Sequence, residues 1–132
     1  MSGALILDSD GLAKAVQRDR EVHEWLTAAR DADLPVITSA AVLVEVIHPR
    51  INDAALRWTL SRLRVEPVTQ PIAQSAAALL RAARLHGHKY AIDAMLCATA
   101  LAQPGRVTVL TSDVEDITLL TTDHPRVTAE KV

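Results

Sequence analysis

The sequence predicts an α/β fold with a parallel sheet, because short apolar runs alternate with longer segments of helical spacing. Short apolar runs are typical of strands that are buried on both faces. No internal repeat, low-complexity stretch or linker interrupts the 132 residues, and 49% of them are hydrophobic, enough for one well-filled core. We therefore expect a single domain over residues 1–132, with helices covering both faces of the sheet.

The first half of the chain predicts two buried strands, each followed by a helix. The first strand covers residues 4–7, and a helical stretch follows it to about residue 29. The second strand covers residues 34–37. The next helix runs from about residue 40 to 47 and is ended by Pro49. Two hydroxyl residues are candidates for its N-cap, Thr38 and Ser39.

The second half continues the same alternation and adds three strands. In order, we expect a helix capped by Asn52, a strand over 65–68, a helix from Pro71 to a stop at Gly87, a helix over 90–102, a strand over 107–110, a short helix, and an edge strand at 127–128. Strands separated by helices in this way form parallel sheets, whose ligand sites lie beyond the carboxyl ends of the strands.

Four carboxylates stand out at or near that edge. Asp8 ends the first strand, and Asp113 follows the strand over 107–110. Glu45 and Asp93 lie in helical segments and are surrounded by apolar residues, where an uncompensated charge is costly. Glu45 has only a histidine within one helical turn, and Asp93 has a lysine at i−4, the less favourable order for an ion pair.

A shared divalent cation would compensate these charges. Acid clusters without a thiol or a histidine pair favour Mg²⁺ or Mn²⁺, and we expect Asp8, Asp93 and Asp113 to hold the metal. Asp116 lies three residues after Asp113, on the same helix face, and is a further candidate ligand. Such a site suits hydrolysis of a phosphodiester bond, because a metal activates water and neutralises charge on the phosphate.

Each candidate also has a purely structural interpretation. Asp8 could start a turn, and Glu45 could face solvent. Asp93 could be an acid in the first turn of a helix, where the helix dipole favours negative charge. The sequence Ser112–Glu115 matches a capping box, which would give Asp113 no catalytic role. Other conspicuous residues are expected to be structural: two histidines at a helix end, a core cysteine and two packing tryptophans, namely His86, His88, Cys97, Trp25 and Trp58.

The charge and composition exclude several classes of protein. A net charge of −2 excludes a basic coat that binds nucleic acid by charge alone, and only three aromatic residues argue against a base-stacking surface. One cysteine excludes a disulfide framework and fits the cytoplasm. No run approaches the roughly 20 apolar residues that span a membrane, and we see no signal peptide.

Four segments together resemble a PIN domain, and the size resembles the VapC type of toxin ribonuclease. The segments, in chain order, are Leu5–Ser9, Thr38–Val46 with Glu45, Gly87–Ala100 with Asp93, and Val109–Asp113 with Asp116. The resemblance implies a three-layer α/β/α sandwich and Mg²⁺-dependent cleavage of RNA. It implies that Asp8, Glu45, Asp93 and Asp113 fill the four acidic positions of the family, with Asp116 beside them. It also implies a homodimer, and inhibition by an antitoxin that covers the acidic pocket.

Two other functions remain open at this point. The sequence Asp8–Gly11 matches the start of a haloacid-dehalogenase-like phosphatase, with Asp8 as nucleophile and Asp10 as acid/base. That family's lysine motif has no convincing counterpart between the acids. A non-catalytic PIN or receiver-like binding module is the other alternative, although an inactive PIN domain is expected to have lost acids and this chain keeps them.

Overall fold

A computed structural model describes residues 3–132. They form a five-stranded parallel sheet with strand order β3-β2-β1-β4-β5 and seven helices around it. The strands are β1 (Gly3–Leu7), β2 (Val36–Ser39), β3 (Arg64–Glu66), β4 (Arg106–Thr111) and β5 (Val127–Lys131). The helices are α1 (Ser9–Val16), α2 (Arg20–Asp31), α3 (Val42–Val46), α4 (Asp53–Ser61), α5 (Gln70–Ala83), α6 (Gly87–Leu101) and α7 (Val114–Leu120). The predicted α/β class with a parallel sheet is confirmed.

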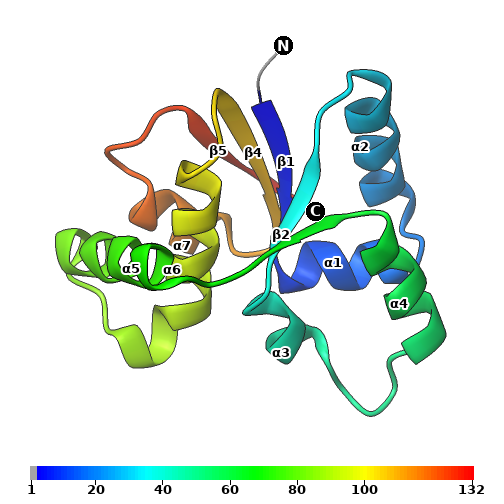
Figure 1. The fold of residues 1–132 in the computed structure, drawn as a ribbon, viewed down its shortest axis with the longest axis horizontal. Coiled ribbons are helices and arrows are strands. Elements are labelled where there is room, and N and C mark those ends of the chain that lie inside the picture. The colour runs from blue at the N-terminus through cyan, green and yellow to red at the C-terminus, as the bar shows by residue number, and fades with distance from the viewer. Residues whose placement is uncertain (1–2) are drawn as a thin grey trace.

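The helices cover both faces of the sheet, as Figure 1 shows. Helices α1 to α4 lie on one side, where α1 packs on β1 and β4, and α2 packs on β1. Helices α5 to α7 lie on the other side, where α6 packs on β2 and β4, and α7 packs on β5. The architecture is therefore three-layered, α/β/α.

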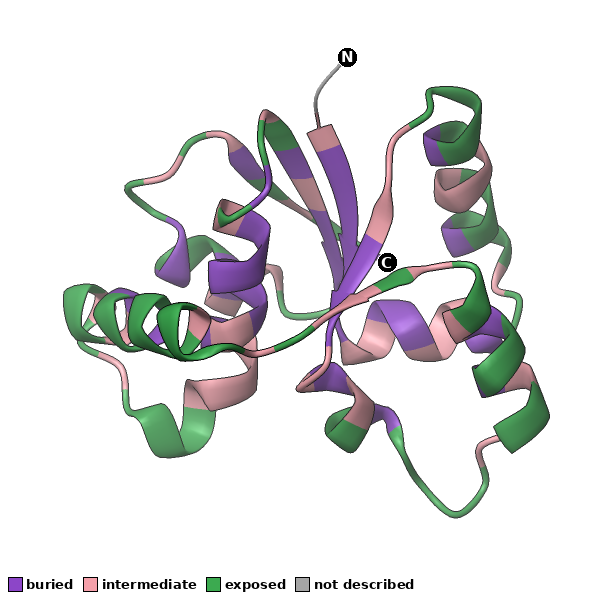
Figure 2. Ribbon diagram, viewed as in Figure 1, coloured by how far each residue is buried: buried purple, intermediate pink, exposed green. Residues whose placement is uncertain are grey.

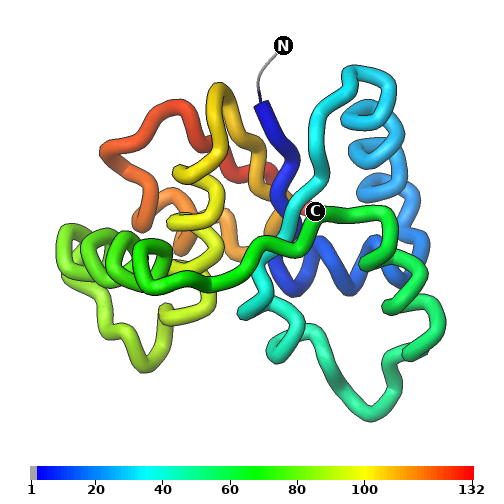
Figure 3. The backbone as a smooth tube through the Cα atoms, in the orientation of Figure 1, coloured from blue at the N-terminus to red at the C-terminus, as the bar shows by residue number. Residues whose placement is uncertain are grey.

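The order of the strands creates a switch point between β1 and β4. From β1 the chain moves outward to β2 and β3 through helices on one face (Figure 3). It then crosses by α5 and α6 to β4, on the opposite side of β1. Connections that leave neighbouring strands toward opposite faces open a crevice beyond their carboxyl ends, and this is where ligands bind in open parallel sheets.

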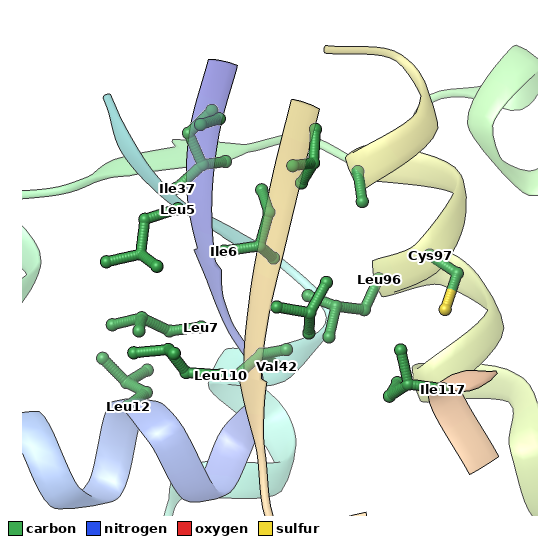
Figure 4. Close-up of a cluster of buried hydrophobic side chains, with 14 of the residues drawn as sticks. Leu5, Ile6, Leu7, Leu12, Ile37, Val42, Leu96, Cys97, Leu110 and Ile117 are labelled. Carbon is green, nitrogen blue, oxygen red and sulfur yellow. The ribbon is translucent and has the colours of Figure 1, made fainter. Parts of the chain in front are cut away.

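The core lies where the two central strands meet the helices on both sides. Ile6 and Leu7 of β1 and Leu110 of β4 are fully buried, as Figure 2 shows for the strands in purple. Leu12 of α1 approaches this layer from one side and Leu96 of α6 from the other (Figure 4). Each such side chain contributes roughly 1.5–3 kcal/mol on burial, so the edge that carries the acids rests on a rigid base.

Several predicted boundaries were wrong. The stretch to residue 29 is two helices, because Arg18 adopts a left-handed conformation (φ 59°) between α1 and α2. Helix α3 covers only Val42–Val46, and no side chain caps it: the Thr38 hydroxyl instead donates to the Leu7 carbonyl at 2.7 Å. Asn52 does cap α4, its carboxamide oxygen accepting from Ala55 N–H at 2.9 Å. None of the helices within residues 3–132 combines the length and apolar character needed to cross a membrane.

Candidate active site

Asp8 lies at the switch point, directly after β1. Its backbone N–H donates to the Leu110 carbonyl of β4 at 3.2 Å, which continues the strand pairing by one residue. Its carboxylate accepts the Gly11 N–H at 2.8 Å and so caps α1. The residue is only 4% exposed. Burial raises the pKa of Asp8 to about 6, with Asp10 and Asp113 adding to the rise and hydrogen bonds from Gly11 and Thr111 opposing it.

Asp93 projects from the second turn of α6. Helices of a parallel sheet run antiparallel to the strands, so this turn lies at the carboxyl edge where β1 and β4 end (Figure 1). Burial raises the pKa of Asp93 to about 7, and the negative charges of Glu45, Asp8, Asp113 and Asp116 raise it further. All five predicted acids therefore gather in one electrostatic environment.

Three of these acids come close enough to share an ion. One carboxylate oxygen each from Asp93, Asp113 and Asp116 lies within 4.8 Å of the other two. Asp113 precedes α7 and Asp116 lies in its first turn, so one short helix supplies two of the three. The group includes Asp116, which the spacing suggested only as a further ligand, and does not include Asp8 or Glu45.

The capping-box interpretation of Ser112–Glu115 was wrong. Asp113 is the N-cap residue of α7, but no side chain makes a capping hydrogen bond there. The Ser112 hydroxyl instead donates to Asp10 of α1, and the Asp113 backbone N–H donates to the Thr111 hydroxyl oxygen at 2.8 Å. The Asp113 carboxylate is therefore not used to cap its own helix and remains available to the acidic group.

Glu45 lies at the rim of the site, on the exposed side of α3. Its carboxylate accepts a short hydrogen bond of 2.5 Å from the Ser9 hydroxyl. Together with the Ser112–Asp10 bond, this contact ties α1 to both neighbouring acidic segments. Ser9 and Thr111 stand next to candidate acids in the chain but carry no pattern that predicts these hydrogen bonds, and Ser112 carries only the capping-box spacing.

The donor set fits a hard divalent cation. The three converging groups are all carboxylates, and the ion pairs within residues 3–132 lie elsewhere, at Arg20–Glu24, Arg57–Asp53 and Arg64–Glu66. No lysine or arginine of the described chain therefore neutralises the site by a direct ion pair. Oxygen-only sites of this kind are typical of Mg²⁺ and Mn²⁺.

Some residues singled out as structural behave as expected and others do not. Cys97 is fully buried, and burial together with Asp93 raises the pKa of its thiol to about 12, so it is an inert core residue. Trp58 is not a packing residue: it is 55% exposed, with the Arg62 guanidinium 5.0 Å from its ring centre. His86 occupies the N-cap position of α6 without a side-chain capping hydrogen bond, and Gly87 begins that helix, so the expectation of a helix C-terminus there was wrong.

A groove lies apart from the acids, between α2, α4 and the start of β2. It has a volume of about 910 Å³ and contains none of the five acids. Leu26, Leu34 and Leu63 give it an apolar lining. Its charged lining is mostly basic, and comprises Arg18, Arg30, Arg62, Arg64, His23 and Asp33.

Comparisons with known proteins place this site in a family. No curated protein matches the chain by sequence. Among solved structures, it is similar to a toxin–antitoxin complex from Klebsiella pneumoniae, with 22% identity and a TM-score of 0.70 over 98% of this chain and 100% of that one. It is also similar to VapBC2 from Rickettsia felis bound to a promoter DNA fragment, with 15% identity and a TM-score of 0.69 over 98% of each chain.

A third similar structure is FitAcB from Neisseria gonorrhoeae, with 18% identity and a TM-score of 0.63 over 95% of each chain. At these identities the likeness shows a shared fold. The family model of the PIN domain matches residues 5–123, a range that contains all five acids. The chain belongs to the PIN domain family.

Proposed function

We propose that the protein is a cytoplasmic Mg²⁺-dependent endoribonuclease, the toxin of a toxin–antitoxin pair. The observation that carries the proposal is the convergence of Asp93, Asp113 and Asp116 within 4.8 Å at the switch point of a PIN fold. PIN domains are generally nucleases, and the absence of a direct ion pair for these acids in the described chain supports a metal as their partner.

In this proposal the role of each acid follows from its position in the site. Asp93, Asp113 and Asp116 would hold the cation, and Asp8 would join them from the end of β1. When bound, the cation supplies a positive charge that polarises the attacking water and neutralises the phosphate. Glu45 and Asp8 would orient that water, because Ser9 and Gly11 hold their carboxylates in place.

The direct test is cleavage of total RNA by the purified chain, in Mg²⁺ and in EDTA. We expect cleavage only with the metal, and a loss on the order of 100-fold in Asp8→Asn and in Asp93→Asn. Asp53→Asn is the matched control, because Asp53 is exposed and pairs with Arg57 away from the site. Wild-type protein that binds Mg²⁺ and cuts no RNA would contradict the proposal.

Asp10→Asn separates this mechanism from the phosphatase alternative. In a phosphatase, Asp10 is the acid/base and its loss abolishes activity. In the proposed nuclease, Asp10 accepts a hydrogen bond from Ser112 and adds to the raised pKa of Asp8, but it lies outside the converging group. We expect Asp10→Asn to keep RNA cleavage within about tenfold of wild type.

The groove supports the partner in this proposal. Its apolar lining and four arginines are complementary to an acidic amphipathic segment of an antitoxin, whose extension would cover the acidic pocket. We expect Trp58→Ala and Arg62→Glu to weaken the complex with a co-purified antitoxin without changing RNA cleavage. We further propose a homodimer, which the molar mass in solution tests directly.

A further inference from the structure

The segment of residues 81–89, which covers the end of α5, the connection and the start of α6, is unusually basic. It contains Arg81, Arg84 and Lys89 together with two histidines, and no acid occurs in the sequence between Glu66 and Asp93. The whole chain has a net charge of −2, so these three charges leave −5 on the remainder. Positive charge is therefore concentrated directly before the segment that carries an acid of the site.

The basic segment is exposed and its charges are free. Arg81, Arg84, His86, His88 and Lys89 are all exposed, and Figure 2 shows the connection between α5 and α6 largely in green. None of the ion pairs within residues 3–132 uses Arg81, Arg84 or Lys89. The Lys89 ammonium lies 5.1 Å from the ring centre of the neighbouring Tyr90, which leaves its hydrogen-bond donors to solvent.

Most of the other basic side chains are engaged or lie elsewhere, apart from Lys131, which ends β5 beside Thr111. Arg20, Arg57 and Arg64 pair with acids, and Arg126 donates to carbonyls that include those of Gln103 and Gly105. Arg18 and Arg62 lie near the Trp58 ring in the groove. Arg106 begins β4, at the opposite edge of the sheet from the acids.

The register of α6 puts part of the basic segment on the face of the site. Lys89 precedes Asp93 by four residues and His86 precedes it by seven, so all three share one face of the helix. The distance along the axis from Asp93 is about 6 Å to Lys89 and about 10 Å to His86. Lys89 makes no ion pair with Asp93, whose pKa is raised by burial and by the neighbouring acids.

The charge of Lys89 does not serve the fold, whereas Arg81 and Arg84 lie at the carboxyl end of α5, where a positive charge is favourable. Lysine in the first turn of a helix is unfavourable beside the positive end of its dipole, and no ion pair in the described chain compensates Lys89. Arg84 is held in a left-handed conformation (φ 58°) that favours glycine. The charge of Lys89, which costs stability and shares a helix face with Asp93, is explained by a ligand that carries negative charge.

We infer that residues 81–89 bind the RNA phosphates next to the one that is cleaved, with Lys89 on the nearest of them. The inference rests on the proposed nuclease function and names how the substrate is held. A strand of RNA that enters an acidic pocket is repelled by it, and cations one helical turn away would offset that repulsion along the backbone. The contacts would be to phosphates, and so independent of sequence.

The test is steady-state cleavage of a labelled single-stranded oligoribonucleotide at several salt concentrations, in constant Mg²⁺. We expect Lys89→Gln to raise KM about three- to tenfold at low salt with little change in kcat, and to lower the salt slope of log kcat/KM by about 0.7, the value for one phosphate of a single strand. Lys89→Arg should restore both. Arg20→Gln is the matched control, because it also removes one exposed charge and brings the net charge to −3.

Arg84→Gly provides a second variant that the fold should tolerate, since glycine suits the conformation at this position. We expect an unchanged or higher Tm and a higher KM. If Lys89→Gln and Arg20→Gln have the same KM and salt slope while wild type cleaves, the inference is wrong and the nuclease function stands. If wild type cleaves no RNA, both are wrong.

Discussion

The carboxylate of Asp93 is half-buried among four other acids, and its pKa of about 7 is the result. A free aspartate has a pKa of about 3.9. Between about pH 4 and pH 7, without a cation, the folded protein therefore holds a proton that the unfolded chain releases. Above pH 7 the ionised form therefore works against folding. The residue has been placed for binding a cation at the expense of the stability of the empty site.

Asp93→Asn should consequently stabilise the metal-free protein. At pH 8 in EDTA, we expect the substitution to raise the free energy of unfolding by at least about 1 kcal/mol, because it removes the repelled charge and keeps the shape. The gain should shrink as the pH falls from 7 toward 4 and vanish below about pH 3, where the aspartate is protonated in both states. Urea denaturation measures it, and Asp53→Asn, which removes an exposed and paired charge, should give no gain. Equal stability of Asp93→Asn and wild type at pH 8 would show that the acids do not repel one another.

The acids could be predicted from the sequence and the hydroxyls that hold them could not. The sequence context marks each acid as a candidate, because a carboxylate in apolar sequence or at the end of a buried strand is costly unless a ligand or a charge compensates it. Ser9 carries no such signal, and the capping-box spacing of Ser112 pointed to the wrong partner. Their partners lie 36 and 102 residues away, and hydrogen bonds between distant segments depend on a packing that the sequence does not display.

At the scale of elements, the position of Asp8 depends on how closely α1 approaches β4. Gly11 lies in the first turn of α1, and a Cβ atom there would be 2.8 Å from the Leu110 carbonyl oxygen of β4. The same residue donates its N–H to Asp8. A side chain at this point would have to move the helix, and with it the capping bond that holds the acid.

Gly11→Ala should therefore destabilise the fold by about 1–3 kcal/mol and lower RNA cleavage, since backbone on the opposing strand cannot give way as a side chain can. Gly87→Ala is the matched change. Its Cβ would meet nothing closer than a Leu80 side-chain carbon at 3.7 Å, and alanine is the better helix former, so stability should stay or rise by up to about 1 kcal/mol. Thermal unfolding of the two variants compares them, and equal Tm values would refute the close approach of α1.

The ends of elements were predicted less well than their existence. Gly87 suggested a helix stop because glycine commonly ends helices, but the left-handed position after α5 belongs to Arg84, and Gly87 begins α6. Ser112 and Glu115 have capping-box spacing, yet the Ser112 hydroxyl finds Asp10 instead. In each case a local rule gave way to a contact from another segment, which no local pattern contains.

On the scale of the whole molecule, acids from every part of the chain meet at one edge of the sheet. Asp8 and Asp93 have raised pKa values of about 6 and about 7. Between about pH 4 and pH 7 the native state therefore binds more protons than the unfolded chain, and the linkage relation makes stability fall as the pH rises through this window. A bound divalent cation has the opposite effect on these pKa values, because it favours the ionised carboxylates.

We therefore expect the Tm of the protein in EDTA to fall from about pH 5 to pH 7.5, and Mg²⁺ to restore it most strongly at the upper end. The comparison of Tm with and without millimolar Mg²⁺ across this range is the measurement, with K⁺ at equal ionic strength as the control for screening. A Mg²⁺ effect that is equal at pH 5 and pH 7.5 would show that these two acids do not take part in binding.

The fold class was available from the alternation of strands and helices, and the resemblance supplied the three layers. The order of the strands could not be predicted in this way, because β1 pairs with β4, which lies far away in the sequence, and periodicity does not encode such pairing. Once the order is known, the gathering of Asp8 and Asp113 follows from geometry alone, since both end neighbouring parallel strands.

The central position of β1 also determines when the sheet can form during synthesis. Its partner β4 begins at Arg106, so the first strand waits for roughly 100 further residues before its second neighbour exists. At about 5–20 residues per second, this delay is on the order of 5–20 s on the ribosome. The last acids, Asp113 and Asp116, emerge after β4. A nascent or prematurely terminated chain that stops before them carries an incomplete acidic group, so we expect the proposed RNA cleavage only from chains that extend beyond Asp116.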